Sequence, residues 1–192
     1  MISLLPPQAD RRRQASRPDF HRSPLLVFYE VTQACDLVCL HCRACAQARP
    51  HVAELSTRAS LQLIDQLAEF PSPPLLVLTG GDPLKRADIF QLIEHAVEAG
   101  LDVSITPSAT PLVTTDSILR LRGAGISRLA ISMDGADAAT HDAIRGVPGS
   151  FDRSLQILAD ARRAGIPTQV NTTLTPANVE QIESLADLLA RQ

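Results

Sequence analysis

The chain has 192 residues, enough for one sizeable domain, and 45% of them are apolar, which provides material for a buried core. The net charge of −3 gives no electrostatic reason to expect nucleic acid, and aromatic residues at 3% are too few for a base-stacking surface. No apolar run approaches the ~20 residues that span a bilayer, and two early prolines interrupt the region where a signal peptide needs an apolar stretch. These features predict a cytoplasmic protein without a nucleic-acid or membrane partner.

The first 23 residues read as a poorly ordered lead-in, because their arginines are scattered among prolines as in a solvated tail. From residue 24 to residue 192, short apolar runs alternate with segments of helical periodicity, so we expect one core domain there. This alternation predicts βαβ units and therefore an α/β fold with a parallel sheet. Strands are predicted over 25–31, 75–78, 101–105, 128–133 and 168–174, and helices over 57–70, 87–98, 115–123, 137–144, 150–164 and 178–191.

Polar or glycine-rich segments follow the first four predicted strands. They are a cysteine-rich loop at 35–45, Gly80-Gly81-Asp82, Thr106-Pro107-Ser108, and Asp134-Gly135. In α/β folds, ligands bind at the carboxyl ends of parallel strands, in barrels and in open sheets alike. All four segments are therefore expected to face one common site.

The four cysteines, Cys35, Cys39, Cys42 and Cys45, all lie within eleven residues. A disulfide framework would spread its cysteines along the chain to close longer loops, so this crowding indicates thiolates that converge on a metal centre. Three readings stay open at this point. They are an iron–sulfur cluster held by three thiols, a ferredoxin-like site that also uses Cys45, and a zinc site.

The C-x3-C-x2-C spacing of Cys35, Cys39 and Cys42 resembles the cluster loop of the radical S-adenosylmethionine (SAM) family. The resemblance implies that these three cysteines hold a [4Fe–4S] cluster whose fourth iron binds the amino and carboxylate groups of SAM. The residue before the third cysteine is usually aromatic in that family and lies near the adenine. Here that residue is His41, which by itself would more often be an exposed loop histidine or a zinc ligand. Cys45 has no counterpart in this pattern.

A second resemblance concerns Thr79-Gly80-Gly81-Asp82-Pro83, which is similar to the family's Gly-Gly-Glu-Pro segment. It implies that Gly80, Gly81 and Asp82 receive the amino group of SAM. The chemistry suits this role, since glycines let the backbone approach a ligand closely and a carboxylate accepts from an ammonium group. Aspartate is one methylene shorter than the usual glutamate, and Gly-Asp-Pro is also ordinary β-turn chemistry.

Ser132-Met133-Asp134-Gly135 followed by Arg145-Gly146 resembles a motif pair of one branch, the enzymes that carry SPASM-type C-terminal domains. By resemblance, Ser132 and Arg145 contact the carboxylate and ribose region of SAM, whereas Asp134 has a structural role in its turn. Ser104 and Asn171 lie near the ends of predicted strands, and Asn171 resembles a SAM-contacting position of the family. A strand-end asparagine can equally bind loop backbone.

The resemblance implies a partial (βα)6 barrel with about five of its six units present. The sixth strand and a C-terminal cluster domain are expected to be absent, which would leave an incomplete core with poor turnover. The implied activity, of the oxidoreductase or maturase class, is reductive cleavage of SAM to a 5′-deoxyadenosyl radical that abstracts hydrogen from a peptide or tetrapyrrole. Flavodoxin or ferredoxin would supply the electron. The residues suggest no general acid–base pair. The alternatives are a non-catalytic iron–sulfur or zinc module and a ferredoxin-like electron carrier.

Overall fold

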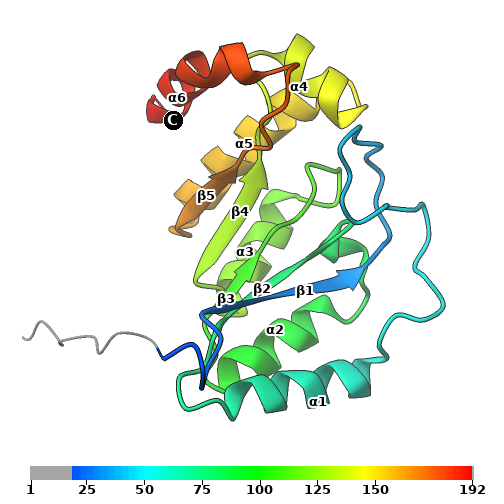
Figure 1. The fold of residues 1–192 in the computed structure, drawn as a ribbon, viewed down its shortest axis with the longest axis vertical. Coiled ribbons are helices and arrows are strands. Elements are labelled where there is room, and N and C mark those ends of the chain that lie inside the picture. Colours follow the sequence, from blue (N-terminus) through cyan, green and yellow to red (C-terminus); the bar gives the residue numbers. More distant parts are fainter. Residues whose placement is uncertain (1–18, 192) are drawn as a thin grey trace, which may run out of the picture.

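The computed structural model describes residues 19–191, so most of the lead-in predicted over 1–23 lies outside the described residues. Ser23 is buried, and its hydroxyl accepts a hydrogen bond from the Ser72 backbone at 3.1 Å. The described residues form a sheet in which five parallel strands lie in sequence order, which confirms the predicted α/β class (Figure 1). The strands are β1 (Leu26–Thr32), β2 (Leu75–Gly80), β3 (Val103–Ile105), β4 (Arg128–Ser132) and β5 (Thr168–Asn171).

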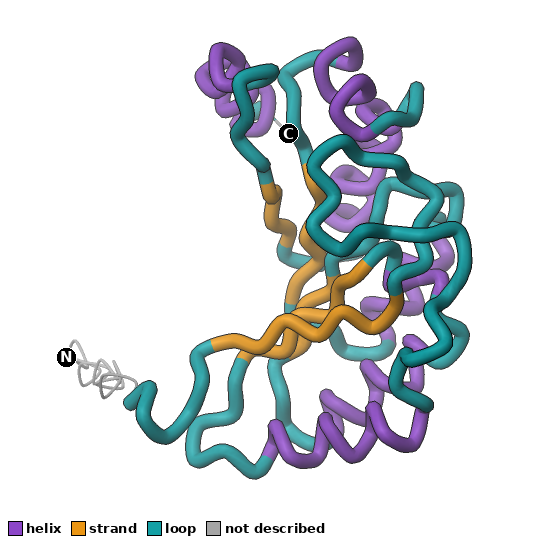
Figure 2. The backbone as a smooth tube through the Cα atoms, turned by 45° about the vertical axis from the view of Figure 1, so that its right-hand side comes forward, coloured by secondary structure: helices purple, strands orange, loops and turns teal. Residues whose placement is uncertain are grey.

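Helices cover one face of this sheet, and Figure 2 shows the other side of the strands largely uncovered. The core lies between strands and helices, because alternate strand residues such as Tyr29, Leu78 and Ile131 point to the helical side and are buried. Leu26 and Phe28 point to the opposite face and remain 38% and 62% exposed.

The helices are α1 (Thr57–Ala68), α2 (Ile89–Glu98), α3 (Thr115–Gly123), α4 (Ala138–Arg145), α5 (Ser150–Arg163) and α6 (Ile182–Ala190), with 3₁₀ turns η1 (Pro83–Lys85) and η2 (Val179–Gln181). No helix of residues 19–191 combines the length and apolarity needed to cross a bilayer.

The last predicted strand, 168–174, is shorter in the structure and ends at Asn171. Polar side chains from other segments take over the backbone groups beyond it. The Thr173 N–H donates to the Asp134 carboxylate at 2.8 Å, and the Asn178 amide donates to the Thr173 carbonyl at 2.8 Å. The segment is thereby bound to the loop after β4 instead of extending the sheet.

The ends of β1 and β2 run unusually close together. The Gly81 and Asp82 N–H groups donate to the carbonyls of Thr32 and Ala34, both at 2.7 Å. Gly80 has φ +134°, which L side chains rarely adopt, and a Cβ there would collide with the Thr32 carbonyl oxygen. A Cβ on Gly81 would collide with the Ala34 carbonyl oxygen. Both glycines are therefore required for the cysteine-rich loop to begin directly beside the second strand.

We predict that Gly80→Ala and Gly81→Ala each lower the free energy of unfolding by about 2–3 kcal/mol, because the new methyl groups meet rigid backbone. Gly123→Ala is the matched control. A Cβ there has no heavy atom of the described residues within 4 Å, so the change is expected to be neutral or to stabilise α3 by up to about 1 kcal/mol. Urea denaturation of the three variants measures the difference. Equal stability of all three would contradict the proposed close approach.

Candidate functional site

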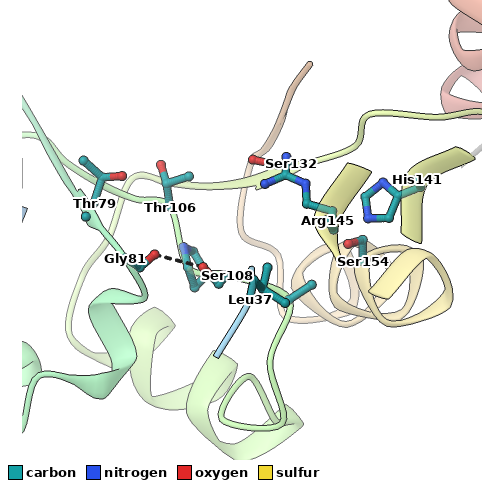
Figure 3. A pocket seen from close by; sticks show the side chains of 12 residues that line it. Leu37, Thr79, Gly81, Thr106, Ser108, Ser132, His141, Arg145 and Ser154 are labelled. Carbon is teal, nitrogen blue, oxygen red and sulfur yellow. Dashed lines mark hydrogen bonds between the residues drawn. The ribbon is translucent and has the colours of Figure 1, made fainter. Parts of the chain in front are cut away.

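Three of the four thiols line one cavity at the carboxyl ends of the strands. Cys35, Cys39 and Cys42 form part of the wall of a space of about 350 Å³. A smaller adjoining space of about 110 Å³ lies between the ends of β2, β3 and β4 (Figure 3). The two cavities share wall residues from the cysteine loop, the ends of β2 and β4, the loop after β3 and α4, namely Leu37, Gly80, Gly81, Ser108, Ser132 and Arg145. The structure therefore brings together segments that are distant in sequence.

The cysteine-rich loop is held in place by backbone hydrogen bonds at both sides. The Cys35 N–H donates to the Gln47 carbonyl at 2.7 Å, and the Leu40 N–H donates to the Ile144 carbonyl of α4 at 3.0 Å. Cys45 is different from the other thiols. It is exposed, lies outside the walls of the thiol cavity, and has a left-handed backbone with φ +47°.

The environment of Cys39 suits a metal-bound thiolate more than a free one. Burial raises the pKa of the Cys39 thiol, and Cys35 and Cys42 add to this, whereas the charge and hydrogen bond of Arg145 oppose it. The Arg145 Nη1 lies 3.7 Å from the Cys39 Sγ. A bound metal deprotonates its thiol ligands, and a nearby guanidinium favours the resulting anion. The donor set therefore fits a group that accepts three thiolates.

Among residues 19–191, no three His, Cys, Asp or Glu side chains converge closely enough to surround a single metal ion. A zinc site requires its ligands to meet at about 2.3 Å from one ion. An iron–sulfur cluster distributes its cysteines over separate irons, so they can line a larger space. Cys35, Cys39 and Cys42 line one such larger space.

Gly80 and Gly81 line both cavities, whereas Asp82, which was also predicted to receive the amino group of SAM, lines neither of them. Its carboxylate is fully buried and accepts from the Leu84 N–H at 3.1 Å and from the Thr110 hydroxyl at 2.7 Å. Burial raises the pKa of Asp82, and these hydrogen bonds oppose the shift. The short side chain folds back onto its own loop, where it positions the loop after β3.

Ser108 belongs to that loop and was not singled out from the sequence. Its hydroxyl donates to the Gly81 carbonyl at 2.9 Å (Figure 3), and it lies 3.3 Å from the Cys35 Sγ. It therefore links the loops that follow β1, β2 and β3. The only signal in the sequence was its place in a polar segment after a predicted strand.

Ser104 and Asn171 were also predicted as site residues. They line a further cavity of about 290 Å³ on the uncovered face of the sheet, which shares Thr106 with the wall of the 110 Å³ cavity. Ser104 lies in the middle of β3, and the Asn171 side chain accepts from the Gln169 amide at 2.7 Å. Neither residue lines the thiol cavity, although Asn171 pairs in register with Ser132, which does.

Asp134 connects the segments around the site. Its fully buried carboxylate pairs with the Arg145 guanidinium through Oδ2 and accepts from the Thr173 N–H through Oδ1 at 2.8 Å. His41, whose ring also lines the thiol cavity, places its Nε2 3.5 Å from the same Oδ2. The Asp134 carbonyl accepts from the Asn178 amide at 2.9 Å. The structural role predicted for Asp134 thus extends to the cysteine loop, α4 and the segment after β5.

We predict that Asp134→Asn lowers the free energy of unfolding by about 3 kcal/mol, because the variant leaves the Arg145 guanidinium, only 13% exposed, without its counter-charge. Asp137→Asn is the control. Asp137 is exposed and caps α4, and asparagine caps equally well, so a change below about 0.5 kcal/mol is expected. Chemical denaturation of both variants tests this. Similar stabilities would show that the buried pair is not a constraint.

Comparison with known proteins places this site in a family. The model described as the radical SAM superfamily matches residues 29–189. The AdoMet-dependent heme synthase of Nitratidesulfovibrio vulgaris is 41% identical over 166 residues, which cover 86% of this chain and 45% of that protein. The mycofactocin maturase MftC of Mycobacterium tuberculosis is 35% identical, covering 88% and 42%. The chain thus spans less than half the length of these curated relatives.

Solved structures show the same fold. Streptococcus suis SuiB bound to S-adenosylmethionine aligns with a TM-score of 0.74 at 21% identity, covering 88% of this chain and 39% of that one. The enzyme anSMEcpe with bound AdoMet aligns with a TM-score of 0.71 at 15% identity, covering 86% and 48%. The predicted likeness to the radical SAM barrel is confirmed. The chain belongs to the radical SAM superfamily, which uses a [4Fe–4S] cluster and SAM, and its relatives are the branch of SPASM-type enzymes.

Proposed function

We propose that this chain is the cofactor-binding core of a radical SAM enzyme in which Cys35, Cys39 and Cys42 hold the cluster. The observation that carries this proposal is the shared cavity. The three thiols and the loops after β2 and β4 line one space, while the fourth thiol, Cys45, is exposed outside it. Three thiolates for four irons leave one iron for SAM.

The remaining wall residues would hold SAM. Gly80 and Gly81 allow the backbone to approach the amino-acid end of SAM, and Ser132 and Arg145 present donors for its carboxylate. His41 is proposed to lie near the adenine. When bound, the cluster and SAM together supply a reductive cleavage that yields a 5′-deoxyadenosyl radical. The electron is proposed to come from a flavodoxin or ferredoxin.

The proposed substrate is a tetrapyrrole. Two relatives support this choice, the heme synthase at 41% identity and the Fe-coproporphyrin III synthase of Methanosarcina barkeri at 35%. The uncovered sheet face offers apolar contacts from Leu26, Phe28 and Val77 with the Arg128 guanidinium among them. Such a surface suits a flat apolar ring system that carries carboxylates.

A peptide is the second candidate substrate, because the 35% identical MftC is a maturase and SuiB bound to the precursor peptide SuiA has the same fold. Titration with Fe-coproporphyrin III separates the two. We expect binding to shift the Soret band of the porphyrin. Phe28→Glu is expected to lower the affinity for the porphyrin at least tenfold, since Phe28 is 62% exposed on that face. An unchanged Soret band would favour the peptide.

We predict that Cys35→Ala, Cys39→Ala and Cys42→Ala each abolish the cluster, while Cys45→Ala, the matched control, retains it. Iron and acid-labile sulfide are counted after anaerobic reconstitution, and 5′-deoxyadenosine is measured after reduction with SAM present. About four irons per chain and SAM cleavage are expected for the wild type and for Cys45→Ala.

Two outcomes would contradict this assignment. Loss of the cluster in Cys45→Ala, as complete as in the other three variants, would indicate a ferredoxin-like carrier with no iron available for SAM. One zinc per chain without sulfide would indicate a non-catalytic module.

A further inference from the structure

His141 is a buried histidine in the smaller cavity that no resemblance assigned to a role. It belongs to α4, is 1% exposed, and lies beside Arg145 and Ser154 in the cavity wall (Figure 3). Its Nδ1 accepts the Asp134 backbone N–H at 3.1 Å. Its ring packs edge-to-face on Phe151, with the ring centroids 5.8 Å apart. The position of the ring is therefore fixed on two sides.

These contacts also fix the tautomer. Because Nδ1 accepts a hydrogen bond, the proton of the neutral ring is on Nε2. Burial, and after it the charge of Arg145, lowers the pKa of His141, while Asp134 and Asp142 act in the opposite direction. The ring is thus neutral near pH 7 and presents a single N–H donor at Nε2.

This donor has no acceptor among residues 19–191, although the atom is buried. The Asp142 carboxylate accepts instead from the Gly149 and Phe151 N–H groups. The Ser154 hydroxyl donates to the Ser150 carbonyl at 2.8 Å and makes no hydrogen bond to the ring. Buried polar atoms are almost always paired, so a buried donor at a cavity wall indicates a bound acceptor.

We propose that His141 is a SAM-binding residue whose Nε2–H donates to the carboxylate of SAM, beside Ser132 and Arg145. This inference rests on the function proposed above. The three side chains lie at the end of β4 and along α4, and all three offer donors to the same 110 Å³ cavity. One guanidinium nitrogen of Arg145 already pairs with Asp134. The remaining donors of the three side chains suit an anion, and the carboxylate is the anionic group of SAM.

Two variants distinguish the role of the Nδ1 acceptor from that of the Nε2 donor. His141→Asn places an amide oxygen near the position of Nδ1, so it can still accept from Asp134, but it lacks the donor at Nε2. His141→Gln reaches further and retains a terminal N–H donor. Asp142→Asn is the control on the same helix, because its side chain caps α5 and lies outside the cavity walls.

The experiment measures equilibrium binding of SAM and of decarboxylated SAM to the anaerobically reconstituted full chain, with iron and sulfide content matched among variants. We expect His141→Asn to weaken SAM binding at least tenfold and to change the affinity for decarboxylated SAM by less than about twofold. Asp142→Asn is expected to bind both ligands as the wild type does. His141→Gln is expected to bind SAM within about threefold of the wild type.

Wild-type affinity of His141→Asn for SAM, or an equal loss for both ligands, would overturn the inference and leave the proposed function intact. Failure of the reconstituted wild type to bind SAM would overturn both. If His141→Asn does not fold, His141→Phe carries the test, because it keeps an aromatic ring beside Phe151 and has no donor. A loss confined to SAM supports the donor role, and wild-type affinity or an equal loss for both ligands rejects it.

Discussion

The buried carboxylate of Asp134 is the constraint on which the site depends. It is fully buried, and its Oδ2 pairs with the Arg145 guanidinium and lies 3.5 Å from the His41 Nε2. Removing one partner from a buried ion pair is strongly destabilising, so this carboxylate fixes the guanidinium in position. Because Arg145 also approaches the Cys39 sulfur at 3.7 Å, the positions of the cysteine loop and of α4 are coupled. The same carboxylate binds the backbone after β5.

A parallel sheet explains why such distant segments meet. Each strand ends at the same edge, so the loops after β1, β2, β3 and β4 lie next to one another. Hydrogen bonds then lock the loops together. Ser108 links Gly81 to the vicinity of Cys35, and the backbone of Gly81 is bound to the end of β1. The cavity is formed by strand ends, the loops that follow them and α4, and these hydrogen-bonded segments suit the holding of a reactive cofactor away from water.

The sequence predicted the features that depend on local pattern. Cysteine spacing, the glycine pair and strand–helix alternation are readable because each is encoded in a few neighbouring residues. The directions of the Asp82 and Ser104 side chains could not be predicted, because side-chain direction depends on packing. Asp82 accepts from Thr110 in the loop after β3, and the period of two in β3 puts Ser104 on the uncovered face. Ser108 and the contacts of Asp134 could not be predicted, since they join residues dozens of positions apart.

The central claim is that three thiolates leave an iron free to bind SAM. The most direct test is the magnetic coupling between the reduced cluster and a labelled nitrogen of SAM. Electron–nuclear double resonance is recorded on the reduced, reconstituted chain with SAM labelled with ¹⁵N at its amino group. The account predicts a ¹⁵N coupling and a changed cluster spectrum when SAM is added, in the wild type and in Cys45→Ala alike. A spectrum that SAM leaves unchanged, without ¹⁵N coupling, would contradict it.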